Sequence, residues 1–448
     1  MYASALYLPV EIKKRELDGQ ILLAKAAAKL GFTVFIGSHA AISSLLEQKK
    51  ERSGIYLDKS VPSFDSLTAI KSKCEAVCIM DAEISPILPL SLTKEMIKAR
   101  TPEYSISLID RYFVANNNAF EAAKEIFGDS HEKIINTGWP RFDVWRGEGE
   151  RYYSLEISKL RRKFGNYLLF ISSFGNLSDP LENLDKVARD NINPTLFWSL
   201  EAQISRYANY QHAIRIIQAW DGIEGVPPII VRPHPSERLE VWRKDLGNLS
   251  KTNVFSKGDV YKWIAASCGV IHEGSTVSLQ AHLMGKDTFF LREVAQLNFV
   301  ELAENISSHT VAKNDPPILM KSGDWSCAVN IKSKTNVNPA LFSRNFSSVT
   351  AIISELKKLT SNRPYEPYRF RWYKVNFLPR KIRRVMGLLR DEIYWKIGKL
   401  TISPQTHKIP WGIRRRDVLK FVAPDSDFRC FKVRRVTANL LELSFRND

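Results

Sequence analysis

Two short segments, each an apolar run that ends in polar residues, contain the residues best suited to chemistry. The first covers residues 229–237 (IIVRPHPSE), and the second covers residues 269–276 (GVIHEGST). Each segment is typical of a buried strand that ends in a polar turn and opens a helix. At the carboxyl ends of parallel strands, helix N-termini present free N–H groups to ligands. Together the two segments predict a cradle for the phosphate of a nucleotide.

His234 is the strongest single candidate in the first segment. It lies between two prolines, which restrict the backbone and hold the imidazole in place. A positioned imidazole can donate a hydrogen bond to a phosphate that leaves as an anion. Arg232 can add a second contact, and Glu237 follows in the same turn. The alternative is a structural helix start capped by Ser236, with Arg232 paired across the sheet or at the surface.

The second segment adds Glu273, Gly274, Ser275 and Thr276 to the candidate donor-binding residues. The glycine permits close backbone approach, and the two hydroxyls together with a helix N-terminus suit a phosphate. Ser and Thr are also ordinary helix caps, so the pairing of this segment with the His-Pro turn is what favours a site. His272 is a further candidate, and a core histidine with satisfied hydrogen bonds is its alternative.

Four carboxylates are candidates for the proton acceptor or nucleophile. Glu16 and Asp18 follow the first predicted strand, and Asp81 and Glu83 follow the strand at residues 75–80. A carboxylate at the end of a strand that faces a crevice can serve in either role. The alternative for Glu16 and Asp18 is that they favour a helix N-terminus through their charge.

The sequence predicts neither a metal site nor a cofactor. The possible zinc ligands His234, Cys268, His272 and His282 lack the usual short ligand spacing. The chain also lacks a G-x-x-x-x-G-K-[ST] loop and a G-x-G-x-x-G motif after the first strand. An ATPase or a dinucleotide-dependent enzyme would therefore be without its signature.

Composition favours a folded protein inside the cell. Five cysteines without CxxC spacing suit a reducing cytoplasm, and no stretch is apolar enough to predict a transmembrane helix or a signal peptide. The net charge of +17 is concentrated after residue 360, where 21 Lys and Arg residues stand against 8 Asp and Glu residues. This basic segment is rich in aromatic residues, so we expect it to contact the inner-membrane surface.

The alternation of strands and helices predicts an α/β protein with two Rossmann-like domains around a central crevice. Ser172 and Ser173, which end the first strand of the second domain, complete the candidate donor-binding set. The expected parts are an N-terminal acceptor domain (1–145), a linker (146–166), a C-terminal donor domain (167–360) and a basic aromatic extension (361–448).

Beyond the two chemical segments, several others stand out, namely LYLPVEIKKRELD (6–18), GIYLDKS (54–60), TGWPRFD (137–143) and ISSFGN (171–176). With RPHPSE (232–237) and HEGSTVSLQAHLMGK (272–286), the chain resembles bacterial capsule and lipopolysaccharide biosynthesis proteins of the GT-B fold, including capsule-type Kdo transferases. The resemblance implies that His234, Ser275 and Thr276 hold the donor phosphate, with Glu237 or Glu273 near the nucleotide. Residues 81–84 (DAEI) depart from the acidic-acidic-Gly pattern of that group.

The expected function is that of a metal-independent glycosyltransferase of surface polysaccharide biosynthesis. It would transfer a sugar, Kdo or a nonulosonic acid, from a CMP-activated donor to a glycan or glycolipid acceptor. A CDP-glycerol-type glycerophosphotransferase and a UDP-sugar epimerase are alternatives on the same fold. A nucleic-acid-binding protein would explain the basic segment but not the paired turns, so nucleic acid is not an expected partner.

Overall fold

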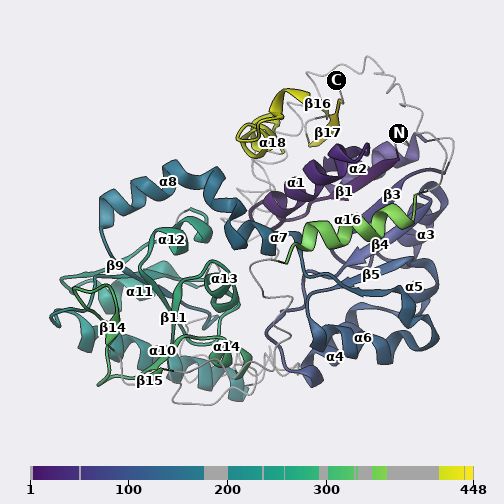
Figure 1. Ribbon diagram of the computed structural model, residues 1–448. Helices are drawn as coiled ribbons and strands as arrows, with labels where there is room; N and C mark the ends of the chain where they lie inside the picture. Colours follow the sequence, from purple (N-terminus) through teal and green to yellow (C-terminus); the bar gives the residue numbers. More distant parts are fainter. Residues whose placement is uncertain are drawn as a thin grey trace, which may run out of the picture.

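The chain forms two α/β domains that lie side by side in a computed structural model (Figure 1). The first is built mainly from residues before α7 (Pro140–Asp143), and the second begins at β7 (Leu168–Ile171). Two Rossmann-like domains confirm the GT-B-like architecture that the sequence predicts. The structure describes residues 4–49, 52–175, 200–234, 237–256, 258–291, 301–326, 329–330, 346–360, 413–437 and 439–446.

An eight-stranded sheet forms the first domain, in the order β16-β17-β2-β1-β3-β4-β5-β6. Strands β1 to β6 are parallel, so their carboxyl ends meet at one edge. The strands are β1 (Ala5–Pro9), β2 (Thr33–Gly37), β3 (Ile55–Asp58), β4 (Ala76–Met80), β5 (Arg111–Val114) and β6 (Ile134–Asn136). The helices are α1 (Lys13–Lys29), α2 (His39–Glu47), α3 (Phe64–Lys73), α4 (Leu90–Arg100), α5 (Glu103–Leu108), α6 (Asn117–Phe127) and α7 (Pro140–Asp143).

Alternating side chains give the first sheet two apolar faces. In β1, Leu6 and Leu8 belong to the core under α1, whereas Ala5 and Tyr7 belong to the core under α2, α3, α4 and α6. Helix α1 crosses α7 so closely that a Cβ on Gly19 would lie 2.7 Å from the backbone nitrogen of Arg141. Only glycine fits at this crossing, which fixes α1 against residues 140–141.

A seven-stranded sheet forms the second domain, in the order β15-β12-β11-β10-β7-β8-β9. All its strand pairs are parallel except that of β12 with β15. The strands are β7 (Leu168–Ile171), β8 (Ile229–Arg232), β9 (Thr252–Val254), β10 (Gly269–His272), β11 (Asp287–Leu291), β12 (His309–Val311) and β15 (Val329–Asn330), beside a small hairpin of β13 (Ile318–Leu319) and β14 (Trp325–Ser326). The helices are α10 (Leu200–Trp220), α11 (Leu239–Leu246), α12 (Val260–Ala266), α13 (Val277–Leu283) and α14 (Glu301–Asn305).

The segment predicted as a linker is mostly helical. A turn of π-helix (Val144–Glu148) leads into α8 (Gly149–Phe164), which packs on α12 of the second domain. Tyr152 and Tyr153 of α8 belong to a core that contains residues of both domains, such as Leu8 and Leu169. The two domains are therefore joined by continuous apolar packing as well as by the chain.

The chain returns to the first domain earlier than the sequence predicts. Helix α16 (Ser348–Lys358) falls within the range expected for the donor domain, yet it packs on α1 and α7 (Figure 1). Asp143 accepts hydrogen bonds from the N–H groups of Ser348 and Val349 at 3.0 and 2.9 Å. A buried carboxylate at a helix start thus ties α16 to the TGWPRFD segment.

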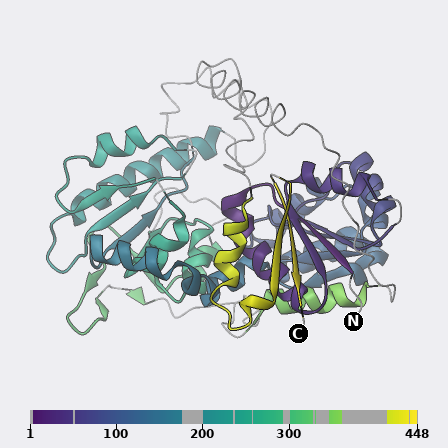
Figure 2. The same ribbon diagram turned by 90° about the horizontal axis from the view of Figure 1, so that it is seen from above.

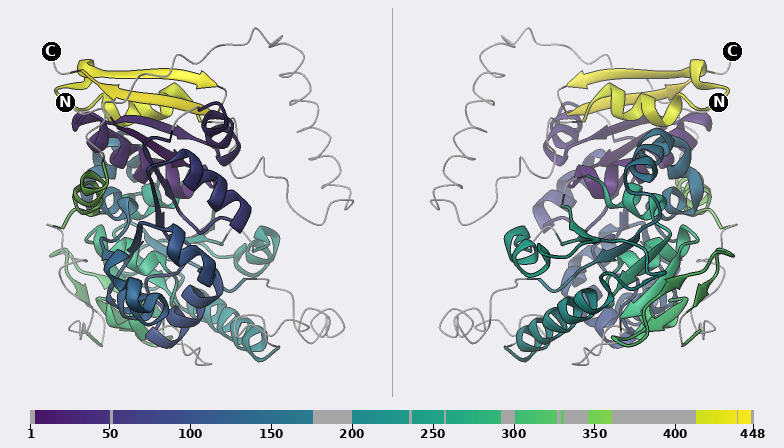
Figure 3. Two further views of the ribbon diagram at one scale, coloured as in Figure 1. Left: turned by 90° about the vertical axis from the view of Figure 1, so that its right-hand side faces the viewer. Right: turned by 90° about the vertical axis from the view of Figure 1, so that its left-hand side faces the viewer.

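The end of the expected basic extension also belongs to the first domain. Helix α18 (Arg415–Val422) and the hairpin of β16 (Phe431–Thr437) and β17 (Leu440–Phe445) follow residue 412, and β17 pairs antiparallel with β2. Figures 2 and 3 show the hairpin beside the first strands of the chain. Buried Val433, Leu441 and Leu443 join the core, because an alternating apolar pattern underlies the basic composition. Residues 361–412 lie outside the described part of the chain.

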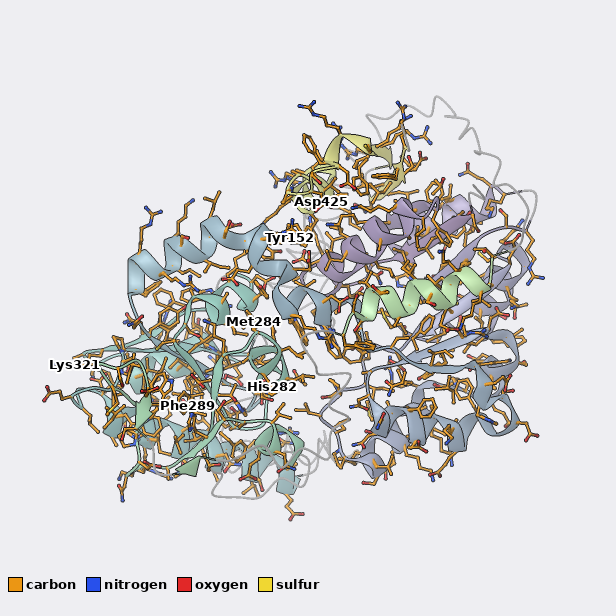
Figure 4. All side chains as sticks on the ribbon, in the orientation of Figure 1. Tyr152, His282, Met284, Phe289, Lys321 and Asp425 are labelled. Atoms are coloured by element: carbon orange, nitrogen blue, oxygen red, sulfur yellow. The ribbon has the colours of Figure 1, made fainter. Side chains whose placement is uncertain are left out.

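A cavity of about 690 Å³ lies between the second half of α1, the start of α8 and residues 425–427. Its charged groups pair with one another, as Lys25 does with Asp425 at 2.9 Å and Lys29 with Asp427 at 2.8 Å. Lys25 also donates to the hydroxyl of Tyr152, and Figure 4 shows Tyr152 and Asp425 at this junction. None of the candidate site residues lines this cavity.

None of the helices in the described part of the chain is long and apolar enough to cross a membrane. Within the same residues, no group of three or more His, Cys, Asp or Glu side chains is arranged to hold a metal ion.

Candidate functional site

The candidate donor-binding residues meet at three adjacent strand ends of the second sheet. Strand β7 lies between β8 and β10, and its last residue, Ile171, pairs with Arg232 on one side and His272 on the other. The polar residues that follow each strand are therefore neighbours at the carboxyl edge. Parallel strand order, and not sequence proximity, brings the serine pair between the two chemical segments.

Glu237 is a buried carboxylate that holds the first turn together. It accepts hydrogen bonds from the hydroxyl of Ser172, from the N–H of Phe174 at 2.8 Å and from the indole N–H of Trp242 at 2.9 Å. The N–H of His234 lies 3.3 Å from the same carboxylate. Burial raises the pKa of Glu237 despite these donors. The carboxylate thus fixes the backbone of the turn, and its own oxygens are occupied.

His234 has a fixed backbone and an exposed side chain. Its N–H donates to the hydroxyl of Ser172 at 3.0 Å, and its carbonyl accepts from the N–H of Glu237 at 2.9 Å. Loss of solvation within the surrounding protein, followed by the charge of Arg15, lowers the pKa of His234. The imidazole is therefore mostly neutral at pH 7, and one ring nitrogen can donate to a ligand.

Glu273 is the second buried carboxylate of this edge. One oxygen accepts from the N–H of Ser173 at 2.7 Å and from its hydroxyl at 2.6 Å. The other oxygen, Oε2, is buried and has no hydrogen-bond partner among the described residues. Burial, with a smaller contribution from the charge of Glu237, raises the pKa of Glu273 to about 8. At neutral pH the side chain is mainly a protonated acid, whose hydroxyl can donate.

His272 and Gly274 shape the backbone between β10 and α13. Gly274 has a φ of +116°, a conformation that favours glycine, and its N–H donates to Nδ1 of His272 at 3.3 Å. The other ring nitrogen of His272 lies 3.0 Å from the hydroxyl of Ser307. Burial lowers the pKa of His272 to about 3, so the ring is neutral. His272 has the contacts of a core histidine that supports the glycine turn.

The hydroxyls of the second segment differ in exposure. Ser275 is buried, and its hydroxyl accepts from the N–H of Val277 at 3.3 Å. Thr276 is exposed at the start of α13, and its hydroxyl makes no hydrogen bond within the described residues. Thr276 is therefore the hydroxyl of this segment that a ligand can reach, whereas the first N–H groups of α13, those of Val277 and Ser278, donate to Ser275.

Arg232 points into the protein. Its guanidinium donates to the carbonyl of Gly258 at 2.9 Å and lies 5.1 Å from the ring centre of Trp263. Burial lowers its pKa, although the charge of Asp259 acts in the opposite direction. The contacts of Arg232 tie the end of β8 to the loop before α12. Pro235 and Ser236 lie outside the described residues.

Among the first-domain carboxylates, Glu16 and Glu83 surround the buried Lys59. Glu16 accepts from the N–H groups of Glu11 and Ile12 at 2.8 and 3.0 Å, which caps α1. The ammonium of Lys59 lies 2.5 Å from Glu83 and 3.3 Å from Glu16. Burial acts to raise the pKa of Glu83, but the hydrogen bond from Lys59 and nearby positive charges outweigh it, so the pKa is lowered.

Asp81 forms a buried ion pair with Arg100. The guanidinium Nε lies 3.2 and 3.1 Å from the two carboxylate oxygens, and the N–H of Glu83 also donates at 3.3 Å. Burial raises the pKa of Asp81, against the effect of Arg100. Both oxygens are therefore engaged with groups of the first domain.

Asp18 lies where the two domains meet. It accepts a hydrogen bond from the hydroxyl of Tyr153 in α8. Burial raises the pKa of Asp18 to about 6; the hydrogen bond from Tyr153 lowers it, and the charge of Asp259 adds to the rise. Lys262 and Lys420 lie 4.6 and 3.7 Å from the ring centre of Tyr153. Burial therefore brings the pKa of Asp18 close to neutral, which suits a proton acceptor.

The first turns of α1 face the second domain. Arg15 lies close enough to His234 to lower its pKa, and the charge of Lys14 lowers that of Asp259. Asp18 is three residues after Arg15 and therefore on the same side of the helix. The candidate carboxylate thus shares one side of α1 with the arginine whose charge acts on the candidate phosphate ligand.

Sequence reasoning missed several groups at these edges. Lys59 directly follows the buried strand β3, whose last residue is Asp58, so the sequence did contain a local signal for both. Asp58 lies 3.5 Å from Nδ1 of His39. Tyr153 and Asp259 gave no local signal, because only the tertiary structure brings α8 and α12 against α1.

A comparison with protein families finds no match, and no curated protein matches the chain. Among solved structures, the chain is similar to the UDP-GlcNAc 2-epimerase from Methanocaldococcus jannaschii, at 13% identity over 80% of this chain and 100% of that chain, with a TM-score of 0.48. It is similar to the Neisseria meningitidis UDP-GlcNAc 2-epimerase bound to UDP-GlcNAc, at 10% identity over 79% and 99%, with a TM-score of 0.47. It is also similar to the wall teichoic acid polymerase TagF, at 13% identity over 64% of this chain and 69% of that chain, with a TM-score of 0.31. With TM-scores below 0.5, these likenesses do not bear on the activity of this chain.

Proposed function

We propose that the protein is a metal-independent GT-B-type glycosyltransferase of surface polysaccharide biosynthesis. Its donor would be a CMP-activated acidic sugar, Kdo or a nonulosonic acid, and its acceptor a glycan or glycolipid. The observation that carries the proposal is the convergence of Ser173, His234, Glu273 and Thr276 at three adjacent strand ends. The assignment of a CMP donor and of Kdo rests on the resemblance of the sequence motifs to those of capsule-type Kdo transferases.

The donor side supports binding of a nucleotide phosphate. His234 and Thr276 can donate to the phosphate oxygens, where negative charge grows as the sugar departs. Protonated Glu273 can donate from Oε2 to a nucleotide hydroxyl, since that oxygen is buried without a partner in the described part of the chain. Glu237, Ser172 and Arg232 would keep these groups in position through contacts inside the domain.

On the acceptor side we assign the proton acceptor to Asp18. A carboxyl group with a pKa of about 6 is mostly ionised at pH 7 and still basic enough to accept a proton from an acceptor hydroxyl. Tyr153 would hold it in orientation. Glu16, Glu83 and Asp81 are engaged with Lys59, backbone N–H groups and Arg100, so they would support the site and not react.

We expect the purified protein to bind CMP in preference to CDP, UDP and GDP, as measured by ligand-observed NMR. His234→Ala should weaken CMP binding roughly 10- to 100-fold, because a hydrogen bond to a charged group contributes about 1.5–3 kcal/mol. His131→Ala, an exposed histidine of the first domain, is the matched control and should bind as the unaltered protein does.

Other nucleotide preferences would replace the proposal. CDP preference would favour a glycerophosphotransferase, and UDP preference a UDP-sugar epimerase or a different transferase. If none of the four nucleotides binds, the donor site assigned to His234 is wrong, and a binding protein without nucleotide chemistry becomes the better description.

We also propose that the basic C-terminal region contacts anionic lipid at the inner membrane while the protein resides in the cytoplasm. Its described part exposes basic side chains on α18 and β16, namely Arg415, Arg416, Lys432 and Arg435. Each such charge near an anionic surface contributes about 1 kcal/mol.

Replacing these four residues with glutamine should therefore lower the apparent affinity for phosphatidylglycerol vesicles roughly 100-fold or more. Sedimentation of the protein with the vesicles measures this affinity. The matched control removes four exposed basic residues of α8, namely Lys159, Arg161, Arg162 and Lys163. Equal vesicle binding by both variants would exclude membrane contact through this surface.

A further inference from the structure

The side chain of Arg141 has a fixed place that the proposed reaction does not yet use. It belongs to the TGWPRFD segment, where Pro140 starts α7. Its guanidinium lies 4.0 Å from the ring centre of Trp139 and 5.6 Å from that of Trp145. The backbone of Arg141 is held against Gly19 of α1. A guanidinium stacked on an indole keeps its plane and presents its N–H edge in one direction.

The hydrogen-bonding capacity of Arg141 is largely unused. A guanidinium carries five N–H donors. Within the described residues, Nη2 donates to the carbonyl of Ala82 at 3.3 Å, and the buried Nε has no partner. No carboxylate of the described part of the chain forms an ion pair with Arg141. Buried polar atoms are almost always partnered in folded proteins, so these donors point to a ligand.

The negative charges around Arg141 do not balance the positive charge of its guanidinium. Burial, followed by the charge of Arg15, lowers the pKa of Arg141 to about 9. Glu83 and Glu16 act in the opposite direction, but both are already engaged with Lys59. An anion placed at the guanidinium would restore the balance.

The location of Arg141 is on the side that faces the donor site. Ala82, which accepts its hydrogen bond, follows β4 at the carboxyl edge of the first sheet. Arg15 is 47% exposed and lies 3.6 Å from Glu83, and its charge acts on the pKa of both Arg141 and His234 of the second domain. A ligand group at Arg141 and Arg15 would thus lie at the carboxyl edge of the first sheet, close to an arginine whose charge also acts on His234.

We propose that Arg141, assisted by Arg15, binds an oxyanion of the substrate, a carboxylate or a phosphate, through its free N–H edge. Such groups match the planar guanidinium in shape and charge. The inference deepens the proposed function and rests on it for the identity of the substrate. Two sources can supply the anion: the carboxylate of an acidic donor sugar, or a phosphate on the acceptor.

Calorimetric titrations of the full chain distinguish these sources. The probes are CMP, CMP-N-acetylneuraminic acid, which adds a sugar carboxylate, and inorganic phosphate added to the CMP-saturated protein. If the donor supplies the anion, Arg141→Gln should weaken binding of the CMP-sugar at least 10-fold and leave CMP within twofold. If the acceptor supplies it, the same variant should weaken phosphate binding at least 10-fold and leave both nucleotides unchanged.

Variants with matched controls separate recognition from folding. Arg141→Lys keeps the charge without the fork and should recover only part of the affinity. Arg15→Gln, at a more exposed position, should weaken binding of the same probe by about threefold. This variant replaces Arg141→Gln in the test if Arg141→Gln does not fold. Arg162→Gln, an exposed arginine of α8, should have no effect.

Two results would overturn the inference. One is unaltered binding of all three probes by folded Arg141→Gln, or by Arg15→Gln where the former does not fold. The other is an equal loss of CMP and the CMP-sugar with unchanged phosphate binding, which would indicate general distortion. Failure of the proposed function is a separate observation, since it would appear as absence of CMP binding in the unaltered protein. Phosphate titration without nucleotide would then still test Arg141.

Discussion

Replacing Glu273 with glutamine is expected to stabilise the protein at alkaline pH by about 3–5 kcal/mol relative to the unaltered chain. Burial raises the pKa of Glu273 from 4.5 to about 8 in the folded state. The favourable contribution of the neutral acid is complete below pH 4.5 and is lost as the pH rises towards 8. Glutamine keeps an acceptor for the two donors of Ser173 and carries no charge at any pH.

Urea unfolding followed by circular dichroism at pH 5 and pH 9 measures this effect. The advantage of Glu273→Gln should be small at pH 5 and should grow through pH 8. Glu240→Gln, an exposed carboxylate of α11, is the matched control and should show no such growth. A constant difference between Glu273→Gln and the unaltered protein at both pH values would mean that Glu273 is ionised in the folded state throughout.

Removal of the Glu237 carboxylate should cost about 3–4 kcal/mol of stability, because several donors lose their acceptor at once. The indole N–H of Trp242 and the N–H of Phe174 are buried and would remain unpaired in Glu237→Ala. The N–H of His234 and the hydroxyl of Ser172 would be released as well. The turn that presents His234 should therefore loosen, and CMP affinity should fall with stability.

Thermal and urea unfolding of Glu237→Ala, Glu237→Gln and Glu240→Ala test this account. Glutamine retains one acceptor oxygen, so its loss should be intermediate. The exposed control Glu240→Ala should change the free energy of unfolding by less than about 0.5 kcal/mol. If Glu237→Ala unfolds like the unaltered protein, the four hydrogen bonds do not organise the turn.

The sequence by itself determined the local elements and the edge at which the donor residues lie. Apolar runs that end in Pro, Gly or Ser define β7, β8 and β10 and the turns after them. In a parallel sheet all these turns must lie at one edge, so the sequence predicts a common edge for Ser173, His234 and Glu273. Which turns are neighbours depends on the strand order β8-β7-β10, and the tertiary structure decides that order.

Only the tertiary structure decided how the four candidate carboxylates differ. Their sequence contexts are alike, since each follows a strand. Their partners come from distant positions: Asp81 pairs with Arg100, Glu83 with Lys59, and Asp18 meets Tyr153 of another element. A pKa depends on burial and on these partners, and neither is encoded in local spacing.

The tertiary structure likewise decided the roles of Arg232, His272 and the C-terminal residues. Arg232 ends its strand at the edge where ligands bind, yet its side chain turns inward to Gly258, and His272 contacts Ser307. The basic composition after residue 360 hid the alternating apolar residues of β16 and β17, which pair back onto β2. Side-chain direction and strand pairing across hundreds of residues arise from packing of the whole chain, which a local pattern does not contain.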